Sequence, residues 1–193
     1  MQSFPIFINL KKKPVTVIGG GDIALRKVRL LLKAGPNITV ISKEICKDLK
    51  ELLMEDNHKI LQKSFHEDDL KTPALIIAAT NNAKTNKRIS TYAQRENILI
   101  NVVDQPKLCT FTMGSIVERD SLVVSISSGG KAPVLVRRIR EKIETLLPQS
   151  YAELVSLSGS LRAIVKKKIQ SGIKRRIFWE EFFESDYVQN FIL

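Results

Sequence analysis

The sequence feature that most constrains the fold is the run Val15-Thr-Val-Ile-Gly-Gly-Gly-Asp-Ile-Ala-Leu-Arg-Lys27. A short β-branched stretch enters three glycines, and a basic, helix-like segment follows them. The spacing Gly19-x-Gly21-x-x-Ala24 is typical of a dinucleotide-binding turn, with glycines for the tight bend and for close approach of a pyrophosphate. The same spacing also fits a ligand-free turn in a small α/β domain. Other segments of the chain must therefore discriminate between the two.

Buried strands and helices alternate along the first half of the chain. The predicted strands are 15–18, 37–41, 59–63, 74–79 and 98–103, and the predicted helices are 22–34, 43–55 and a polar one that follows residues 80–82 and ends near 96. Apolar strands separated by helices predict a parallel sheet with right-handed crossovers. Because ligands of such sheets bind beyond the carboxyl ends of the strands, four segments are expected at one edge: Gly19–Gly21, Ser42, Thr80 and Asp104.

The pattern changes after about residue 110. Segments 110–117 and 121–127 are predicted strands, joined by the short polar link Glu118-Arg-Asp120 as in a hairpin. A helix over 132–147 follows Ser127-Ser-Gly-Gly130, and the remainder after Pro148 is helical in character. There, four aromatic residues share one helix face and are expected to pack: Phe178, Trp179, Phe182 and Phe183. The predicted fold class is α/β, with a Rossmann-like parallel sheet domain, a small α+β region and a C-terminal helical domain.

The charge balance limits the classes of partner. Lys and Arg number 31 against 20 Asp and Glu, a net charge of +11 that attracts polyanions: nucleic acid, an anionic membrane, or a ligand with many carboxylates or phosphates. No helix-turn-helix, zinc knuckle or RNA-binding strand motif is present, so no nucleic-acid partner is expected. No apolar run approaches the roughly 20 residues that cross a bilayer, and segment 4–10 is too short for a signal peptide. We expect a cytoplasmic protein without a membrane partner.

Several polar residues follow the predicted strands and are candidates for ligand binding. The acid that usually binds a ribose is replaced by Ser42-Lys43; the serine suits a ribose hydroxyl and the lysine a 2′-phosphate, which leaves NAD and NADP both open. The carboxylate of Asp104 suits a general base, a cation ligand or a turn cap. The segment Ser127–Gly130 suits either an anion cradle or an ordinary helix cap. Two cysteines and two histidines, in no metal-ligand spacing, predict no metal centre.

An ordered set of segments resembles the precorrin-2 dehydrogenases, including the N-terminal part of bacterial sirohaem synthase and the yeast dehydrogenase/ferrochelatase. The set comprises Pro5-Ile-Phe-Ile-Asn-Leu10, Val17-Ile-Gly-Gly-Gly-Asp22, Ala78-Ala-Thr-Asn81, Asn101-Val-Val-Asp104, Pro106-Lys107, Ser127-Ser-Gly-Gly130, Pro133-Val-Leu135, Leu146-Leu-Pro148 and Phe178-Trp-Glu180. The resemblance covers essentially the whole chain. It implies oxidation of precorrin-2, a tetrapyrrole polycarboxylate, to sirohydrochlorin with NAD as hydride acceptor, in sirohaem biosynthesis.

The resemblance also implies an organisation and a set of residue roles. The chain would form a homodimer with an NAD-binding Rossmann domain over 1–113, a dimerisation region over 114–147 and a helical C-terminal domain over 148–193. Asp104 matches the catalytic aspartate, whereas Ser128, Gly129 and Lys107 match the substrate side. The cofactor would contact a larger set: Gly19, Gly20, Gly21, Asp22, Ile23, Ser42, Lys43, Ala79 and Thr80.

Three alternatives to a dehydrogenase remain at this point. Some family members also insert ferrous iron, a step attributed to the same aspartate, but two histidines and no ligand cluster favour dehydrogenation alone. The net charge of +11 keeps open a second alternative, a regulator that senses nucleotides or binds nucleic acid. The third is a catalytically silent tetrapyrrole carrier, which would bind the macrocycle but consume no NAD. Because the chain ends at Leu193, the methyltransferase half of the bacterial synthase is expected to be absent.

Overall fold

The structure is a computed structural model that describes residues 3–54, 57–70 and 72–192. The chain divides into two compact units, Met1–Met113 and Gly114–Leu193. Each unit has its own secondary-structure class, so each is described by itself. Among the described helices, none is both long enough and apolar enough to cross a membrane.

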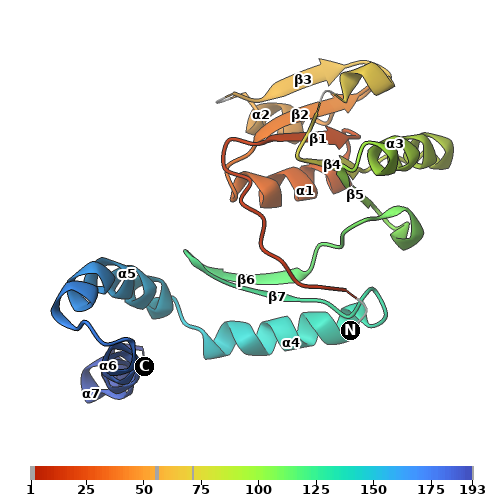
Figure 1. Ribbon diagram of the computed structural model, residues 1–193. Helices are drawn as coiled ribbons and strands as arrows, with labels where there is room; N and C mark the ends of the chain where they lie inside the picture. The colour runs from red at the N-terminus through yellow and green to blue at the C-terminus, as the bar shows by residue number, and fades with distance from the viewer. Residues whose placement is uncertain (1–2, 55–56, 71, 193) are drawn as a thin grey trace. The chain divides into compact units, whose positions relative to one another are not determined.

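A five-stranded parallel sheet forms the centre of the first unit (Figure 1). Its strands lie in the order β3-β2-β1-β4-β5, with bounds β1 (Pro14–Ile18), β2 (Asn37–Ser42), β3 (Lys59–Gln62), β4 (Leu75–Ala78) and β5 (Leu99–Val102). The helices are α1 (Asp22–Leu32), α2 (Lys47–Leu52) and α3 (Ala83–Arg95), with short 3₁₀ turns η1 (Glu67–Asp69) and η2 (Pro106–Leu108). The direction of strand addition reverses between β1 and β4. Such a reversal is where doubly wound sheets bind ligands.

Two apolar clusters cover the two faces of this sheet. In β4, Leu75 and Ile77 belong to the cluster under α1 and α2, whereas Ile76 and Ala78 belong to the cluster under α3. Alternate residues of a strand point to opposite faces, so a strand that is apolar throughout must be covered on both. This pattern explains why the strands lack polar alternation, and it confirms the predicted α/β class.

Two predicted bounds are wrong, one in the first unit and one where the second unit begins. The helix expected over 43–55 begins only at Lys47, because the preceding residues cross the glycine turn and the Cys46 amide donates to the Gly20 carbonyl at 2.8 Å. Its predicted end at Glu55 lies outside the described residues. The strand expected over 110–117 begins only at Ser115, since the Thr110 amide donates instead to the Ile100 carbonyl at 2.9 Å.

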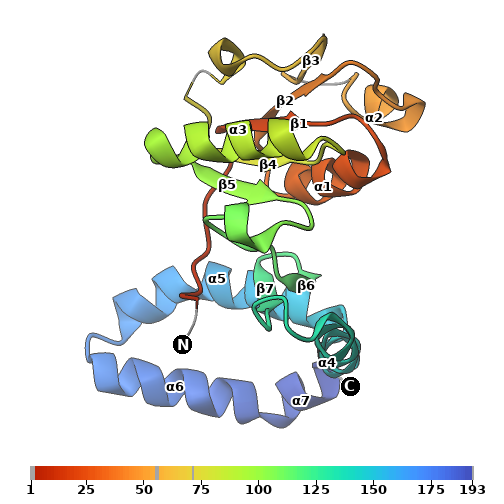
Figure 2. The same ribbon diagram turned by 90° about the vertical axis from the view of Figure 1, so that its right-hand side faces the viewer.

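The second unit combines a hairpin with four helices (Figure 2). The hairpin is β6 (Ser115–Arg119) with β7 (Leu122–Ile126), and the helices are α4 (Pro133–Leu146), α5 (Ser150–Lys168), α6 (Gly172–Glu184) and α7 (Asp186–Ile192). The link is Asp120-Ser121 rather than residues 118–120, because Arg119 still pairs with Leu122 and Asp120 takes the left-handed conformation, with φ 53°. Ring contacts at 5.2–5.8 Å join Trp179 to the other three predicted aromatic residues of α6, which confirms that they pack together.

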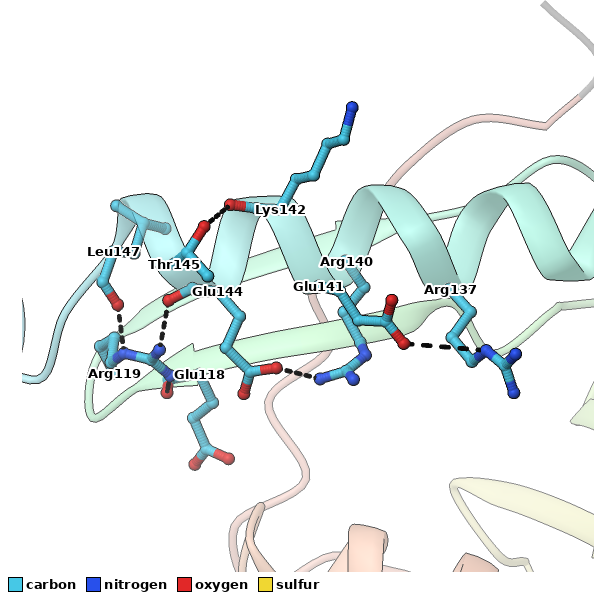
Figure 3. Close-up of polar contacts among 9 residues, drawn as sticks. All are labelled: Glu118, Arg119, Arg137, Arg140, Glu141, Lys142, Glu144, Thr145 and Leu147. Atoms are coloured by element: carbon cyan, nitrogen blue, oxygen red, sulfur yellow. Dashed lines mark hydrogen bonds and ion pairs between the residues drawn. The ribbon is translucent and has the colours of Figure 1, made fainter.

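An arginine of the hairpin caps the end of α4 (Figure 3). Arg119 Nε donates to the Leu147 carbonyl at 2.6 Å, and Nη2 donates to the Glu144 carbonyl at 3.1 Å. The last carbonyl groups of a helix have no partner within the helix, and a guanidinium satisfies several of them at once. The side chain therefore fixes the end of α4 to β6.

Arg119→Met is expected to destabilise the second unit by about 1–3 kcal/mol, because half-buried carbonyl groups lose charged donors. Urea denaturation followed by circular dichroism measures the change. The matched control is Arg137→Met, which removes an exposed Arg137–Glu141 ion pair on the same helix and is expected to cost a few tenths of a kcal/mol. Equal effects of the two substitutions would contradict a capping role for Arg119.

Candidate functional site

The carboxyl ends of β1, β2 and β4 bring the predicted cofactor segments to one edge of the sheet. The Ala79 amide donates to the Ile18 carbonyl at 2.7 Å, and the Gly19 amide donates to the Ile41 carbonyl at 2.9 Å. These bonds extend the strand pairing one residue beyond Ile18 of β1 and Ala78 of β4. The glycine turn therefore lies between the ends of the two neighbouring strands, with Ala79 on one side and Ser42 on the other.

The three glycines of the turn differ in whether the fold requires them. Gly19 has φ +124°, and a Cβ there would collide with the Ala79 carbonyl oxygen. A Cβ on Gly20 would collide with the Glu44 carbonyl oxygen. A Cβ on Gly21 would meet nothing within 4 Å, and its φ of −91° suits any residue. The fold thus explains the first two glycines, whereas the third leaves open space that the fold does not use.

That open space lies at the N-terminus of α1. Gly21 is the N-cap residue and offers no side chain to the amide groups of the first turn. Asp22 and Ile23 begin the helix, and helix N-termini attract anions through their free amide groups and the helix dipole. A diphosphate has the charge for this position, and the absent side chain leaves room for its close approach. The residues present therefore fit the pyrophosphate of a dinucleotide.

Thr80, predicted to contact a cofactor, has its hydroxyl group engaged within the protein. The hydroxyl donates to Asn86 Oδ1 at 2.6 Å, and Asn86 Nδ2 donates back to the Thr80 carbonyl at 3.0 Å. Asn86 is 1% exposed, so this pair holds the loop after β4 against α3. Sequence reasoning missed Asn86, although an asparagine on the buried face of a predicted helix was a usable signal.

The ends of β2 and β5 present the remaining candidates of this unit. Ser42 is half-buried at the end of β2, Lys43 is exposed beside it, and Lys107 is exposed within η2. Asp104 is exposed and has a left-handed backbone, with φ 57°. Its carboxylate accepts no hydrogen bond from the described part of the chain. An exposed carboxylate at this edge is available to take a proton from a ligand.

The loop that carries Asp104 is held at several points. Cys109 Sγ accepts a hydrogen bond from the Val102 amide at 3.1 Å, and the Ser90 hydroxyl donates to the Leu108 carbonyl at 2.7 Å. Contacts at the C-terminal end of η2 therefore attach the loop to β5 and α3. Sequence reasoning assigned no role to Cys109 or Ser90, and nothing in their spacing indicated one.

A lysine not singled out by the sequence lies near Asp104. Lys27, on α1, is half-buried. Burial and the like charge of Arg26 hold the pKa of its ammonium group below the ordinary value, whereas the Asp104 carboxylate and the Cys109 thiol act in the opposite direction. The ammonium is thus partly desolvated close to the candidate base.

Lys27→Met is expected to raise the melting temperature at pH 7 by about 1–3 °C, since it removes a charge that folding desolvates. The cost of that charge is present below the lowered pKa and disappears as the pH rises past 10.5, the ordinary value. The difference in melting temperature between the variant and the parent should therefore become smaller from pH 7 to pH 11. Lys87→Met, at an exposed position of α3, is the control and should change little. A destabilised Lys27→Met variant would contradict the prediction.

Ser128 and Gly129 belong to the second unit, before α4. The Ser128 hydroxyl accepts a hydrogen bond from the Ala132 amide at 3.0 Å, and Gly129 has φ 61°. The Ser127 hydroxyl accepts from the Gly129 amide at 3.1 Å. The two serines thus stabilise the turn, as in the capping alternative, while the Ser128 hydroxyl hydrogen stays available to a ligand.

The parallel sheet, the reversal between β1 and β4 and the open helix N-terminus together define a dinucleotide-binding protein of the Rossmann class. Three family models match consecutive parts of the chain: "Putative NAD(P)-binding" over residues 6–115, "Sirohaem biosynthesis protein central" over 119–146 and "Sirohaem synthase dimerisation region" over 150–191. The chain belongs to the family of the precorrin-2 dehydrogenases and the N-terminal regions of sirohaem synthases. The resemblance noted from the sequence is therefore confirmed.

Curated relatives agree with this assignment. The "Siroheme synthase" of Ruthia magnifica subsp. Calyptogena magnifica is 48% identical over 183 residues, which are 95% of this chain and 39% of the relative. That of Methylobacillus flagellatus is 46% identical over 184 residues, with the same two coverages. The chain thus spans about two fifths of the length of these relatives. A solved structure, "SirC, precorrin-2 dehydrogenase", has the same fold, with a TM-score of 0.78, 23% identity and coverage of 96% of this chain and 92% of its own.

Proposed function

We propose that this protein is an NAD-dependent precorrin-2 dehydrogenase that oxidises precorrin-2 to sirohydrochlorin in sirohaem biosynthesis. The observation that carries the proposal is the open N-terminus of α1 at Gly21, at the sheet edge that also carries Asp104. Family membership supplies the substrate class. The net charge of +11 favours a substrate with many carboxylates.

The cofactor would be held by segments at the ends of three strands. Gly19, Gly20 and Gly21, with the first amide groups of α1 at Asp22 and Ile23, would bind the pyrophosphate. Ser42 and Lys43 would contact the adenosine ribose, and Ala79 and Thr80 the nicotinamide side. NAD, when bound, accepts a hydride from the substrate. The half-buried Ser42 hydroxyl favours NAD, which has a free ribose hydroxyl at that position.

Removal of a hydride from precorrin-2 also requires loss of a proton, and Asp104 is the residue proposed to take it. Its carboxylate is exposed and lies on a loop that hydrogen bonds attach to β5 and α3. A positioned carboxylate acts as a general base without a metal ligand set. Lys107, Ser128 and Gly129 are proposed to bind carboxylates of the substrate, through an ammonium group, a hydroxyl and a backbone amide.

We propose a homodimer in the cytoplasm, with three parts: residues 1–113 for the cofactor, 114–147 for dimerisation and 148–193 as a helical domain. The match of 150–191 to a sirohaem synthase dimerisation region supports the second copy, and it extends the proposed contact beyond 114–147 into the helical domain. The second copy is also supported by the exposed apolar residues of α4, Val134 at 63%, Leu135 at 58% and Leu146 at 72%, which a partner would shield from water. Sedimentation of the full chain at micromolar concentration tests the assembly.

The activity is tested anaerobically, with precorrin-2 and either NAD or NADP, by following the absorbance of the nicotinamide and of the macrocycle. Stoichiometric NADH and sirohydrochlorin are expected. A parallel sample contains the protein with sirohydrochlorin and ferrous iron but without NAD. It is expected to form sirohaem no faster than a control without protein. Absence of NAD or NADP reduction at substrate saturation would refute the dehydrogenase.

A further inference from the structure

The outer edge of β5 leads to the thiol of Cys109, which lies beside the turn that carries Asp104. Because β5 is at one end of the described sheet, backbone groups on its outer side have no neighbouring strand to pair with. The chain returns along this edge after η2, which lies next to β5 (Figure 2). There the Thr110 amide donates to the Ile100 carbonyl, and the Ile100 amide donates to the Thr110 hydroxyl, both at 2.9 Å. The returning segment thus takes the place of a sixth strand.

Two residues further along β5, the Cys109 thiol continues this pairing. Its sulfur accepts a hydrogen bond from the Val102 amide at 3.1 Å, and the thiol donates to the Val102 carbonyl at 3.3 Å. The thiol also donates to the Gln105 carbonyl at 3.4 Å. A thiol has a single hydrogen, so the two carbonyl groups share it. One side chain therefore contacts the backbone on both sides of residues 103 and 104.

The position of Asp104 depends on this turn over residues 102–105. The Gln105 amide donates to the Val102 carbonyl at 3.3 Å, and Asp104 has a left-handed backbone, with φ 57°. A residue other than glycine keeps such a conformation where its surroundings enforce it. Within the described part of the chain, no hydrogen bond orients the Asp104 carboxylate. Only the backbone of the turn can do so, and the thiol spans the two ends of that turn.

Cys109 is itself held in place from several directions. Its amide donates to the Pro106 carbonyl at 3.1 Å, and the Ser90 hydroxyl of α3 donates to the adjacent Leu108 carbonyl at 2.7 Å. Ser90 is 1% exposed, and Cys109 packs against the apolar cluster under α3. Asn101 Nδ2 donates to the sulfur at 3.8 Å. A side chain that is fixed by packing and hydrogen bonds can in turn fix a neighbouring functional group.

We infer that Cys109 is a positioning residue of the proposed active site: its thiol fixes the turn 102–105 and so holds the Asp104 carboxylate where it takes the proton. The inference rests on the proposed function of Asp104 as a base, whereas the contacts of the thiol do not. A displacement of about 1 Å at an active site costs about 10²-fold in rate, so a small relaxation of the turn affects turnover. The competing explanation is that the thiol only fills space beside α3, which predicts lower stability without a specific loss of kcat.

Cys109→Ala removes every hydrogen bond of the thiol and tests its role in turnover. The kcat for precorrin-2 oxidation should fall at least tenfold, with the KM for precorrin-2 and the Kd for NAD within twofold of the parent. Cys109→Ser keeps a donor and an acceptor at this position and should restore kcat to within threefold. The matched control is Cys46→Ala, because Cys46 is also half-buried but its thiol forms no hydrogen bond among the described residues. Equal losses of kcat in the two alanine variants would overturn the inference.

A double-mutant cycle shows whether the thiol acts through Asp104. When Cys109→Ala is added to Asp104→Asn, the single-turnover rate should fall less than twofold, because the carboxylate that the thiol positions is already absent. A tenfold loss in both backgrounds would overturn the inference, since the thiol would then act independently of Asp104. A raised KM with an unchanged kcat would also overturn it, because the thiol would then serve binding.

Hydrogen exchange separates this inference from the proposed function. The Val102 amide, followed by nuclear magnetic resonance in the full-length protein, should exchange at least tenfold faster in Cys109→Ala and within threefold of the parent in Cys109→Ser. Unchanged exchange of this amide in Cys109→Ala would refute a hold of the thiol on the turn, whatever happens to turnover. A parent that oxidises no precorrin-2 would refute the dehydrogenase, and faster exchange at Val102 would still support the hold of the thiol on the turn.

Discussion

Asp104→Asn is expected to lower kcat for precorrin-2 oxidation by about 10²–10⁴-fold while leaving the Kd for NAD within about twofold. The substitution keeps the size of the side chain and removes its ability to take a proton. Asparagine also tolerates the left-handed backbone at this position, φ 57°, so the loop should keep its conformation. Anaerobic turnover and NAD titration measure the two effects.

Two further variants separate the charge of Asp104 from its backbone. Asp104→Ala should lose the same turnover and also about 1 kcal/mol of stability, because alanine is disfavoured at positive φ. Asp120→Asn is the matched control, since Asp120 has the same left-handed conformation in the β6–β7 turn, φ 53°, and should leave turnover unchanged. Near-parental oxidation by Asp104→Asn would exclude this carboxylate as the base.

Gly21→Asp is expected to raise the Kd for NAD at least 100-fold without loss of stability. Nothing in the protein obstructs a side chain at Gly21, and aspartate is among the best residues at a helix N-cap, so the melting temperature should stay equal or rise slightly. The new carboxylate would occupy the space proposed for the pyrophosphate and repel its charge. Calorimetric titration with NAD and thermal melts of the same samples test both parts.

The neighbouring glycine is the contrasting control. Gly20→Ala places a Cβ against the Glu44 carbonyl oxygen and is expected to lower the melting temperature, by about 4 °C or more. A stable Gly20→Ala protein would show that the turn is looser than the structure indicates. Unchanged NAD affinity in Gly21→Asp would refute the assignment of this helix N-terminus to the cofactor.

Elements whose local pattern agrees with their environment were predicted well. The strands 15–18 and 37–41 are apolar on both faces, and the helix after Asp22 has an apolar stripe on one side, so periodicity alone located them. The helix expected from residue 43 was placed four residues too early. Its first residues have ordinary helix propensity, but the Cys46 amide bonds to Gly20, a contact from a distant part of the chain.

The candidate site shows the same division. Gly19, Gly21 and Asp104 were identifiable because glycine spacing and a carboxylate at a strand end are local features. Lys27 and Cys109 were not, since their proximity to Asp104 depends on how α1 and the loop after β5 pack.

The sequence by itself determined the order of strands and helices, the glycine turn and the family, because each is recorded in residues close together or in their succession. The tertiary structure alone distinguished the glycines: neighbouring carbonyl groups require Gly19 and Gly20, whereas Gly21 borders open space. In the sequence the three residues are consecutive glycines, and nothing in their type or spacing tells them apart. Only the position of Ala79 and Glu44 in space separates a glycine that the fold needs from one for which we propose a ligand.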